Sequence, residues 1–375
     1  MGVFLLGKPQ ATDINVRRTL VVYNTASTDG LAVANYYVAN RPGMATVDVL
    51  GVTADTTEVT TSANMQSQIR TPIRNWLAAN PSPAKRYIVM CRGLPSRVHD
   101  AGNTSSVDYM LARSDPNMAN AVGTEYAQLG SFYFTLRATP FDPASFPGTS
   151  FLVTRMDMGG SLAATKAYID KIKAMYNAMP VPAVLVSAKA ASLGGSNYWL
   201  DDCRDPAYSA AFNASYPYQQ FYSLYGFTSP PKMNYQFGLT SDPQAPFSPC
   251  ADVTAYMGWG THASLPSNYA YNGTSLVFTG KSSWYIVTTV ESFSGIISSG
   301  QGNFETWFKD TAVGGAAYSR TPIGMGCTTD EPTTGGIMRS NAYANWEEGL
   351  PLADCLWSGR ATPYFMAVGD PLVVQ

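Results

Sequence analysis

The amino-acid sequence predicts an α/β protein with a mostly parallel sheet and helices on both faces. Two observations lead to this prediction. Runs of β-branched and apolar residues alternate with segments whose apolar residues recur at helical spacing. Turn-forming residues separate the two kinds of segment. Strands that alternate with helices in this way are typical of parallel sheets covered by helices.

The first strand and helix illustrate the pattern. Residues 19–24 form a β-branched run that stops at Asn24, and residues 25–30 are turn formers. Asp29 is a candidate cap for the helix that follows. Apolar residues then recur at helical spacing until the helix closes at Pro42. This segment is therefore expected to form a strand, a turn and a helix.

The later elements repeat this alternation. We expect strands at residues 46–52, 86–91, 151–155 and 183–187, and helices at residues 65–79 and 162–179. Two further strand-like runs end near Met257 and Val290. Residues 191–250 are rich in Tyr, Pro and Ser and are expected to form a loop-rich connection. The chain is therefore expected to contain two α/β halves, residues 1–190 and 251–375.

The composition narrows the classes of function. Charged residues make up 13% of the chain, about half of the roughly 25% usual for soluble domains, which favours a secreted, periplasmic or cell-surface protein. The net charge of −2 supplies no basic field, so we expect no nucleic-acid partner. No run of about 18 apolar residues exists, so we expect no membrane span. The apolar patch at residues 3–6 is too short for a signal peptide, so a signal is either absent or removed from this numbering.

The same composition predicts self-association, or association with another surface protein. Aromatic residues make up 12% of the chain, and protein interfaces are enriched in aromatic residues and depleted in Lys, Glu and Asp. We expect light scattering at micromolar concentration to find a homo-oligomer. A clean monomer would contradict this prediction and favour a solitary secreted protein kept soluble by Ser, Thr and Asn.

The five cysteines lack any spacing typical of a metal site. Cys91 lies in an apolar run, so we expect a buried core thiol there. If disulfides form, the expected pairs are Cys203 with Cys250 and Cys327 with Cys355.

The candidate site lies in the two loops that follow the runs ending near Met257 and Val290. The carboxyl ends of neighbouring parallel strands are where ligands bind in open α/β sheets. The first loop carries Trp259 and Gly260, and the second carries Glu291 and Ser292. The sequence therefore predicts that these residues face one crevice.

Several blocks of sequence resemble one uncharacterised bacterial family. The blocks are residues 20–24 with 34–37 and Arg41, 87–98, 105–108, 152–157, 258–259, 291–295, 331–332 and 368–372. The chain also resembles gingipain- and caspase-like cysteine peptidases, in which one strand precedes His-Gly and another precedes the nucleophilic Cys. Here the His position reads Trp259 and the Cys position reads Ser292. This resemblance implies a caspase-like fold that has lost its peptidase dyad.

An alternative is a serine-type hydrolase. Ser292 would be the nucleophile, His262 its base, and backbone N–H groups near Gly260 the oxyanion hole. We favour a structural interpretation in which Ser292 caps a helix that begins at Phe293, because no G-x-S-x-G elbow accompanies the serine. Under that interpretation His262 lies in an exposed loop.

Charged residues supply two further candidate sets. Glu291, Asp330 and Glu331 with His262 could hold a divalent cation, but their spacing matches no metal motif, so we expect no metal and no cofactor. Arg92 and Arg97 directly follow a strand, while Asp108 and Asp157 occupy comparable strand or loop positions; we favour structural ion pairs between Arg and Asp over substrate binding. Arg92, Asp330 and Glu331 remain candidate binding residues. The expected function is binding or self-assembly.

Overall fold

The computed structural model describes a defined part of the chain. The described residues are 13–100, 103–112, 151–175, 184–187, 232–235, 250–251, 253, 255–258, 276–289, 292–297, 304–330, 342, 346, 350–360 and 362–375. All structural statements below concern these residues.

The described residues form short strands and helices in an alternating order. The strands are β1 Thr19–Asn24, β2 Asp48–Val52, β3 Val59–Thr60, β4 Tyr87–Cys91, β5 Arg97–Asp100, β6 Asn103–Ser106, β7 Leu152–Met156, β8 Val184–Ser187, β9 Lys232–Tyr235, β10 Cys250–Ala251, β11 Ala255–Gly258, β12 Phe278–Thr279, β13 Ile286–Thr289, β14 Gly324–Thr328 and β15 Phe365–Gly369. The helices are α1 Asp13–Arg17, α2 Thr28–Asn40, α3 Ser62–Asn64, the π-helix η1 Met65–Arg70, α4 Thr71–Ala79, α5 Val107–Ala112, α7 Leu162–Met175, α10 Phe304–Trp307, the 3-10 helix η7 Ala312–Gly314 and α12 Leu352–Gly359.

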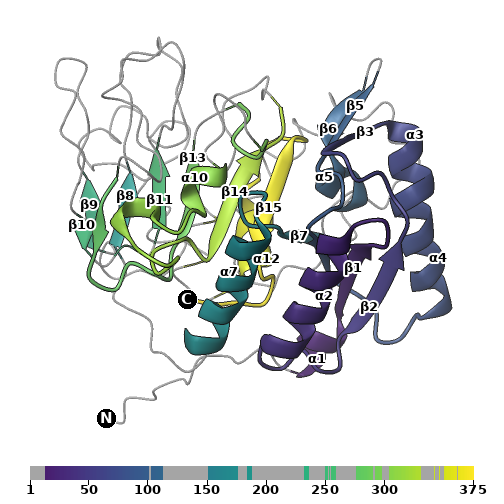
Figure 1. Cartoon of the computed structure of the whole chain (residues 1–375), viewed down its shortest axis with the longest axis horizontal. Helices are drawn as coiled ribbons and strands as arrows, with labels where there is room; N and C mark the ends of the chain where they lie inside the picture. Colours follow the sequence, from purple (N-terminus) through teal and green to yellow (C-terminus); the bar gives the residue numbers. More distant parts are fainter. Residues whose placement is uncertain are drawn as a thin grey trace, which may run out of the picture.

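One ten-stranded sheet runs through the molecule in the order β2-β1-β4-β7-β15-β14-β13-β11-β8-β9 (Figure 1). The extended pairings are parallel, except that β14 and β15 run antiparallel over five residue pairs. β15 meets β7 at a single bridge between Val368 and Arg155. The predicted α/β class with a mostly parallel sheet is therefore confirmed. Two small sheets, β3-β5-β6 and β10-β12, flank the large one.

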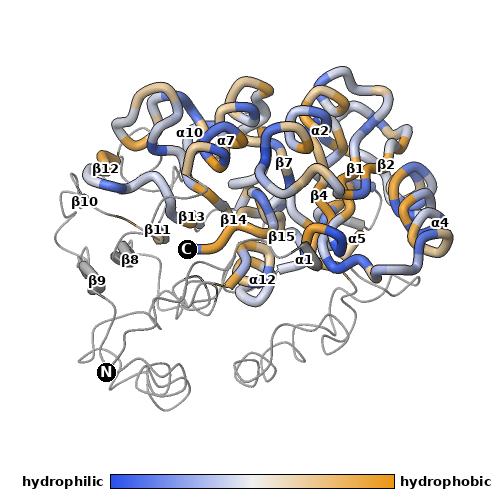
Figure 2. Tube along the Cα trace, turned by 90° about the horizontal axis from the view of Figure 1, so that it is seen from below, coloured by the Kyte–Doolittle hydropathy of each residue, from blue (hydrophilic) through white to orange (hydrophobic). Residues whose placement is uncertain are grey.

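Helices cover both faces of the large sheet, as the sequence predicts. Figure 2 places α2, α7 and α10 on one side of the strands and α4 and α12 on the other. Strands in such a position are shielded from water on both faces, and every residue of β4, β7 and β15 is buried. The core accordingly lies in two layers, one on each face of the sheet.

A buried ion pair ties the end of β15 to the end of α2. Asp370, which follows β15, accepts hydrogen bonds from Arg41 Nε and from the Tyr37 hydroxyl, each at 2.8 Å. Arg41 and Asp370 are both almost fully buried. α2 begins where β1 ends, so its own end marks the opposite edge of the sheet. β15 therefore ends at the edge where β1 begins.

The predicted strands, and the helices expected after residue 30 and at residues 65–79 and 162–179, agree with the structure in the described residues except at some boundaries and one cap. Ser27 caps α2, since its hydroxyl accepts from the Gly30 N–H, whereas Asp29 lies in the first turn and does not cap. The expected helix at 65–79 is a continuous run from α3 through η1 to α4. β8 lies beyond β11, so strands from both predicted halves share the sheet. The boundary between the halves stays a prediction.

The cysteine predictions have mixed outcomes. Cys91 is fully buried and free, which confirms the core thiol. Cys327 and Cys355 are also free and buried, so the expected disulfide between them is wrong. Cys327 lies on β14 and Cys355 inside α12, and each thiol contacts a backbone carbonyl instead. Cys203 lies outside the described residues.

None of the helices in the described part of the chain has the length and apolar character needed to cross a membrane. This agrees with the expectation from the sequence.

Candidate functional site

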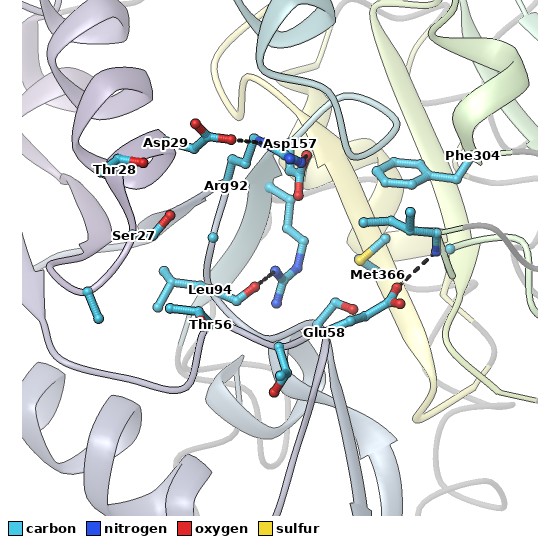
Figure 3. Close-up of a pocket in the computed structure, with 17 residues that line it drawn as sticks. Ser27, Thr28, Asp29, Thr56, Glu58, Arg92, Leu94, Asp157, Phe304 and Met366 are labelled. Atoms are coloured by element: carbon cyan, nitrogen blue, oxygen red, sulfur yellow. Dashed lines mark hydrogen bonds and ion pairs between the residues drawn. The ribbon is translucent and has the colours of Figure 1, made fainter.

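A cavity lies where the loops after β1, β2 and β4 meet the end of β7 (Figure 3). Its volume is about 450 Å³, within the range of small-molecule sites. β1 has β2 on one side and β4 on the other, so the sheet order reverses direction here. Such a switch point is the usual ligand site of open α/β sheets. The lining residues of this switch-point cavity are Ala26, Ser27, Thr28, Asp29, Thr56, Thr57, Glu58, Arg92, Gly93, Leu94, Ser96, Arg155, Asp157, Gly295, Ile297, Phe304 and Met366.

Asn24, the last residue of β1, joins three of the loops that line the cavity. Its amide nitrogen donates to the carbonyl oxygens of Ala54 at 3.0 Å and Gly93 at 2.8 Å. Its amide oxygen accepts from the backbone N–H groups of Ala26 and Ala54. An amide supplies donors and acceptors at once, which neither Asp nor Leu can do. Asn24 therefore fixes the loops relative to one another.

The loop after β4 approaches α2 closely through Gly93. This residue has a φ of +88°, which glycine adopts readily. A Cβ at this position would lie 2.2 Å from the Ser27 hydroxyl oxygen. The close approach brings the N-terminus of α2 and the loop after β4 into one wall of the cavity.

Arg92 joins two carboxylates at the mouth of the cavity. Its Nε lies 2.9 Å from Asp29, and its Nη1 lies 3.1 Å from Asp157. Figure 3 shows this guanidinium between the two acids. Asp157 is buried, and burial raises the pKa of its carboxyl, although Arg92 opposes that shift. The expected ion pair between Arg and Asp is confirmed for Arg92 with Asp157, and Asp29 is an additional partner.

Arg155 forms the floor of the cavity and is fully engaged in hydrogen bonds. Its Nε donates to Asp108 at 2.8 Å, and its Nη1 donates to the Leu94 carbonyl at 3.1 Å. Both charged side chains are buried, at 1% and 0% exposure. Asp108 therefore pairs with Arg155, and Arg97 pairs instead with Asp330 at 2.8 Å. The charge of Arg155 is already balanced before any ligand enters.

Glu58 is the lining carboxylate without an arginine in hydrogen-bond contact. Its Oε1 accepts from the Ile297 N–H at 2.9 Å (Figure 3). Burial raises the pKa of Glu58, and the bond from Ile297 and the charge of Arg155 act in the opposite direction. The side-chain hydrogen bond of Glu58 within the described residues is made by Oε1, and Oε2 takes no part in it. This oxygen can accept a bond from a ligand.

Ser96 supplies a second polar group with unused bonding capacity. It is 9% exposed, and its hydroxyl has no partner in the part of the chain that the structure describes. Buried hydroxyl groups are nearly always hydrogen-bonded, to protein or to an ordered molecule. Within the described residues no group of three or more His, Cys, Asp or Glu side chains has the geometry of a metal site.

The site predicted from the sequence was assigned to the loops after β11 and β13. β11 and β13 are parallel neighbours, with Gly258 opposite Thr289, so the predicted adjacency of the two strands is confirmed. Trp259, Gly260, His262, Glu291 and Glu331 lie outside the described residues.

Besides Arg92, two of the predicted site residues are described, Ser292 and Asp330, and both have structural contacts. Ser292 lies in a turn, where its carbonyl accepts from Thr328 Oγ1 at 2.9 Å. The residues after it continue as a turn, so the helix expected to begin at Phe293 is wrong. The Gly295 N–H is bonded to the Thr328 carbonyl at 2.7 Å, which shapes this turn. Asp330 holds Arg97 by the ion pair described above.

The sequence analysis singled out two parts of the cavity lining as candidate site segments. Arg92 was a candidate binding residue, and the turn after β13 contributes Gly295 and Ile297 to the lining. In the sequence, the polar turn after Asn24 stands between a strand-like run and the start of a helix. This pattern alone is a weak signal for a ligand site. Glu58 carries no local signature.

We predict that Glu58→Gln stabilises the protein by about 0.5–1 kcal/mol at pH 7.5. The pKa of Glu58 is raised in the folded protein, so this carboxyl ionises at lower pH in the unfolded chain than in the folded one. The free energy of unfolding of the wild type therefore falls as the pH rises toward and through the folded-state pKa of Glu58. Gln stays neutral and its amide oxygen can still accept from Ile297. Denaturant unfolding from pH 4 to pH 8 should show that the extra stability of Glu58→Gln over the wild type becomes smaller toward pH 4. A variant less stable than the wild type at pH 7.5 would contradict this account.

No family model, no curated protein and no solved structure matches this chain. The resemblance to an uncharacterised bacterial family and to gingipain- and caspase-like peptidases therefore stays a prediction.

Proposed function

We propose that this protein is a binding protein that holds a small polar organic molecule in the switch-point cavity. The observation that supports this function is the buried Ser96 hydroxyl, which has no hydrogen-bond partner among the described residues, together with the half-buried carboxylate of Glu58, whose Oε1 accepts from the Ile297 N–H. An unused buried polar group costs free energy unless a partner arrives. Hydrogen bonds from a ligand to both groups would offset that cost. Secretion or surface display, and assembly with copies of itself or another surface protein, accompany this proposal as expectations from composition.

Ligand-observed NMR on the full chain tests the proposed function. The probes are glycine, glucose, n-butylamine, butyrate, 1-butanol and inorganic phosphate, each up to about 10 mM. Thr56 is exposed and lines the cavity, so Thr56→Trp should block it without disturbing the core. Asn75 is exposed on α4 and does not line the cavity, so Asn75→Trp is the matched control.

Binding of any probe that Thr56→Trp abolishes and Asn75→Trp preserves would support the proposal. Binding that survives Thr56→Trp would place the ligand elsewhere and overturn it. The absence of binding by every probe would overturn it as well.

The hydrolase alternative predicts a reactive Ser292, and we expect the opposite. Ser292→Ala should leave stability within about 0.5 kcal/mol of the wild type, because the described contact of Ser292 is made by its carbonyl. A fluorophosphonate probe should not label the wild-type protein, since a hydroxyl without a strong base is a weak nucleophile. Labelling that disappears in Ser292→Ala would revive the hydrolase.

A further inference from the structure

The charges around the switch-point cavity do not balance. The lining contains the carboxylates of Asp29, Glu58 and Asp157, and the guanidinium groups of Arg92 and Arg155. Arg155 is paired with Asp108, a buried acid outside the lining. One guanidinium, Arg92, therefore remains for three carboxylates.

Glu58 is the lining acid that no guanidinium contacts by a hydrogen bond, although the charges of Arg155 and Arg97 act on it from further away. Arg92 bonds to the other two lining acids, at 2.9 Å and 3.1 Å. Arg97 is paired with Asp330. The Ile297 N–H supplies Glu58 with one neutral donor. A negative charge that is half-buried beside other acids is stabilised by a cation brought in from outside.

Part of the cavity lining, here called the apolar wall, is made of apolar side chains. Leu94, Ile297, Phe304 and Met366 all line the cavity, and Leu94 and Phe304 are nearly fully buried. Figure 3 shows Phe304 and Met366 on the same side of the cavity as Glu58. A short hydrocarbon chain would bury its methylene groups against these side chains, at about 0.8 kcal/mol for each CH₂.

We infer that the ligand is a small aliphatic amine whose ammonium group is bound by Glu58 and whose hydrocarbon chain packs on the apolar wall. This inference rests on the proposed function. The ammonium supplies three donors, so the Ser96 hydroxyl can accept one bond while Glu58 Oε2 accepts another. A bare divalent cation fits less well, because no metal-type cluster is found among the described side chains. An anion would meet a net negative lining.

Four probes of nearly equal size test the inference: n-butylamine, 1-butanol, butyrate and 1,4-diaminobutane, titrated by calorimetry or NMR at pH 7.5 and low salt. We expect n-butylamine to bind at least tenfold more tightly than 1-butanol, and butyrate not to bind, because a hydrogen bond to a charged group is worth about 1.5–3 kcal/mol. Glu58→Gln should weaken amine binding about tenfold or more and leave 1-butanol unchanged. Gln keeps the acceptor for Ile297, so this variant is expected to fold.

Asp310→Asn is the matched control, because Asp310 is exposed and lies outside the lining. It should leave the affinity for n-butylamine within about twofold of the wild type. Amine binding that Glu58→Gln does not weaken, or tighter binding of 1-butanol or butyrate, would overturn the inference. If a neutral or anionic probe binds more tightly than n-butylamine and Thr56→Trp abolishes that binding, the proposed function stands and only the amine assignment fails. If no probe binds, both fail.

Discussion

Arg155→Met will destabilise the fold by about 3–5 kcal/mol, because it leaves Asp108 buried without its cation. Asp108 has no exposed surface, and Arg155 bonds to its Oδ1 from two nitrogens at 2.8 Å and 2.7 Å. The second oxygen of Asp108 has no described partner, so no other group takes over the charge. Urea unfolding followed by circular dichroism measures the loss. The pKa of Asp108 is already raised by burial and will rise further in the variant.

Two further variants separate the ion pair from the loss of side-chain volume. Arg74 is exposed on α4, so Arg74→Met should change stability by no more than about 0.5 kcal/mol. The double variant Arg155→Met with Asp108→Leu removes both charges, and it should be more stable than Arg155→Met alone. If the double variant is the less stable of the two, the buried charge is not the cause of the loss.

The strands and helices were predictable because their signals are local. β1 and β4 are continuous apolar runs, and α2 shows its apolar spacing, turn and closing proline within about 20 residues. The cap of α2 was assigned to Asp29 because Ser27 and Asp29 are both good capping residues two positions apart. The side chain of Asp29 is used by Arg92 instead, 63 residues away.

The site was not predictable because it depends on which strands become neighbours. β7 lies beside β15, whose sequence follows it by about 200 residues, and β8 lies at the far side of β11. The bond from Ile297 to Glu58 spans 239 residues. No periodicity or motif encodes such contacts, so the raised pKa of Glu58 and the charge imbalance emerge only from the folded chain. The expectation of ion pairs held because Arg and Asp in buried turns have few other partners.

Gly93→Ala will be more harmful than Gly43→Ala, although the two residues have almost the same φ angle. Their φ angles are +88° and +86°, so alanine carries the same backbone cost at both, about 1–2 kcal/mol. At Gly43 the nearest atom to a new Cβ is 3.8 Å away, in the Arg41 side chain. At Gly93 the new Cβ would lie 2.2 Å from the Ser27 hydroxyl oxygen and 2.6 Å from the Ser27 Cβ. Overpacking of this kind adds about 1–3 kcal/mol.

The difference between the two variants therefore measures how tightly the loop after β4 packs on the start of α2. Ser27 caps α2 and lines the cavity, so a displaced Ser27 loses its bond from Gly30 and alters the ligand site. We expect Gly93→Ala to be at least 1 kcal/mol less stable than Gly43→Ala in urea unfolding, and to bind the probes of the cavity more weakly. Equal losses of stability would mean that the loop moves aside at no cost. The cavity wall would then be adaptable, and a ligand would have to order it on binding.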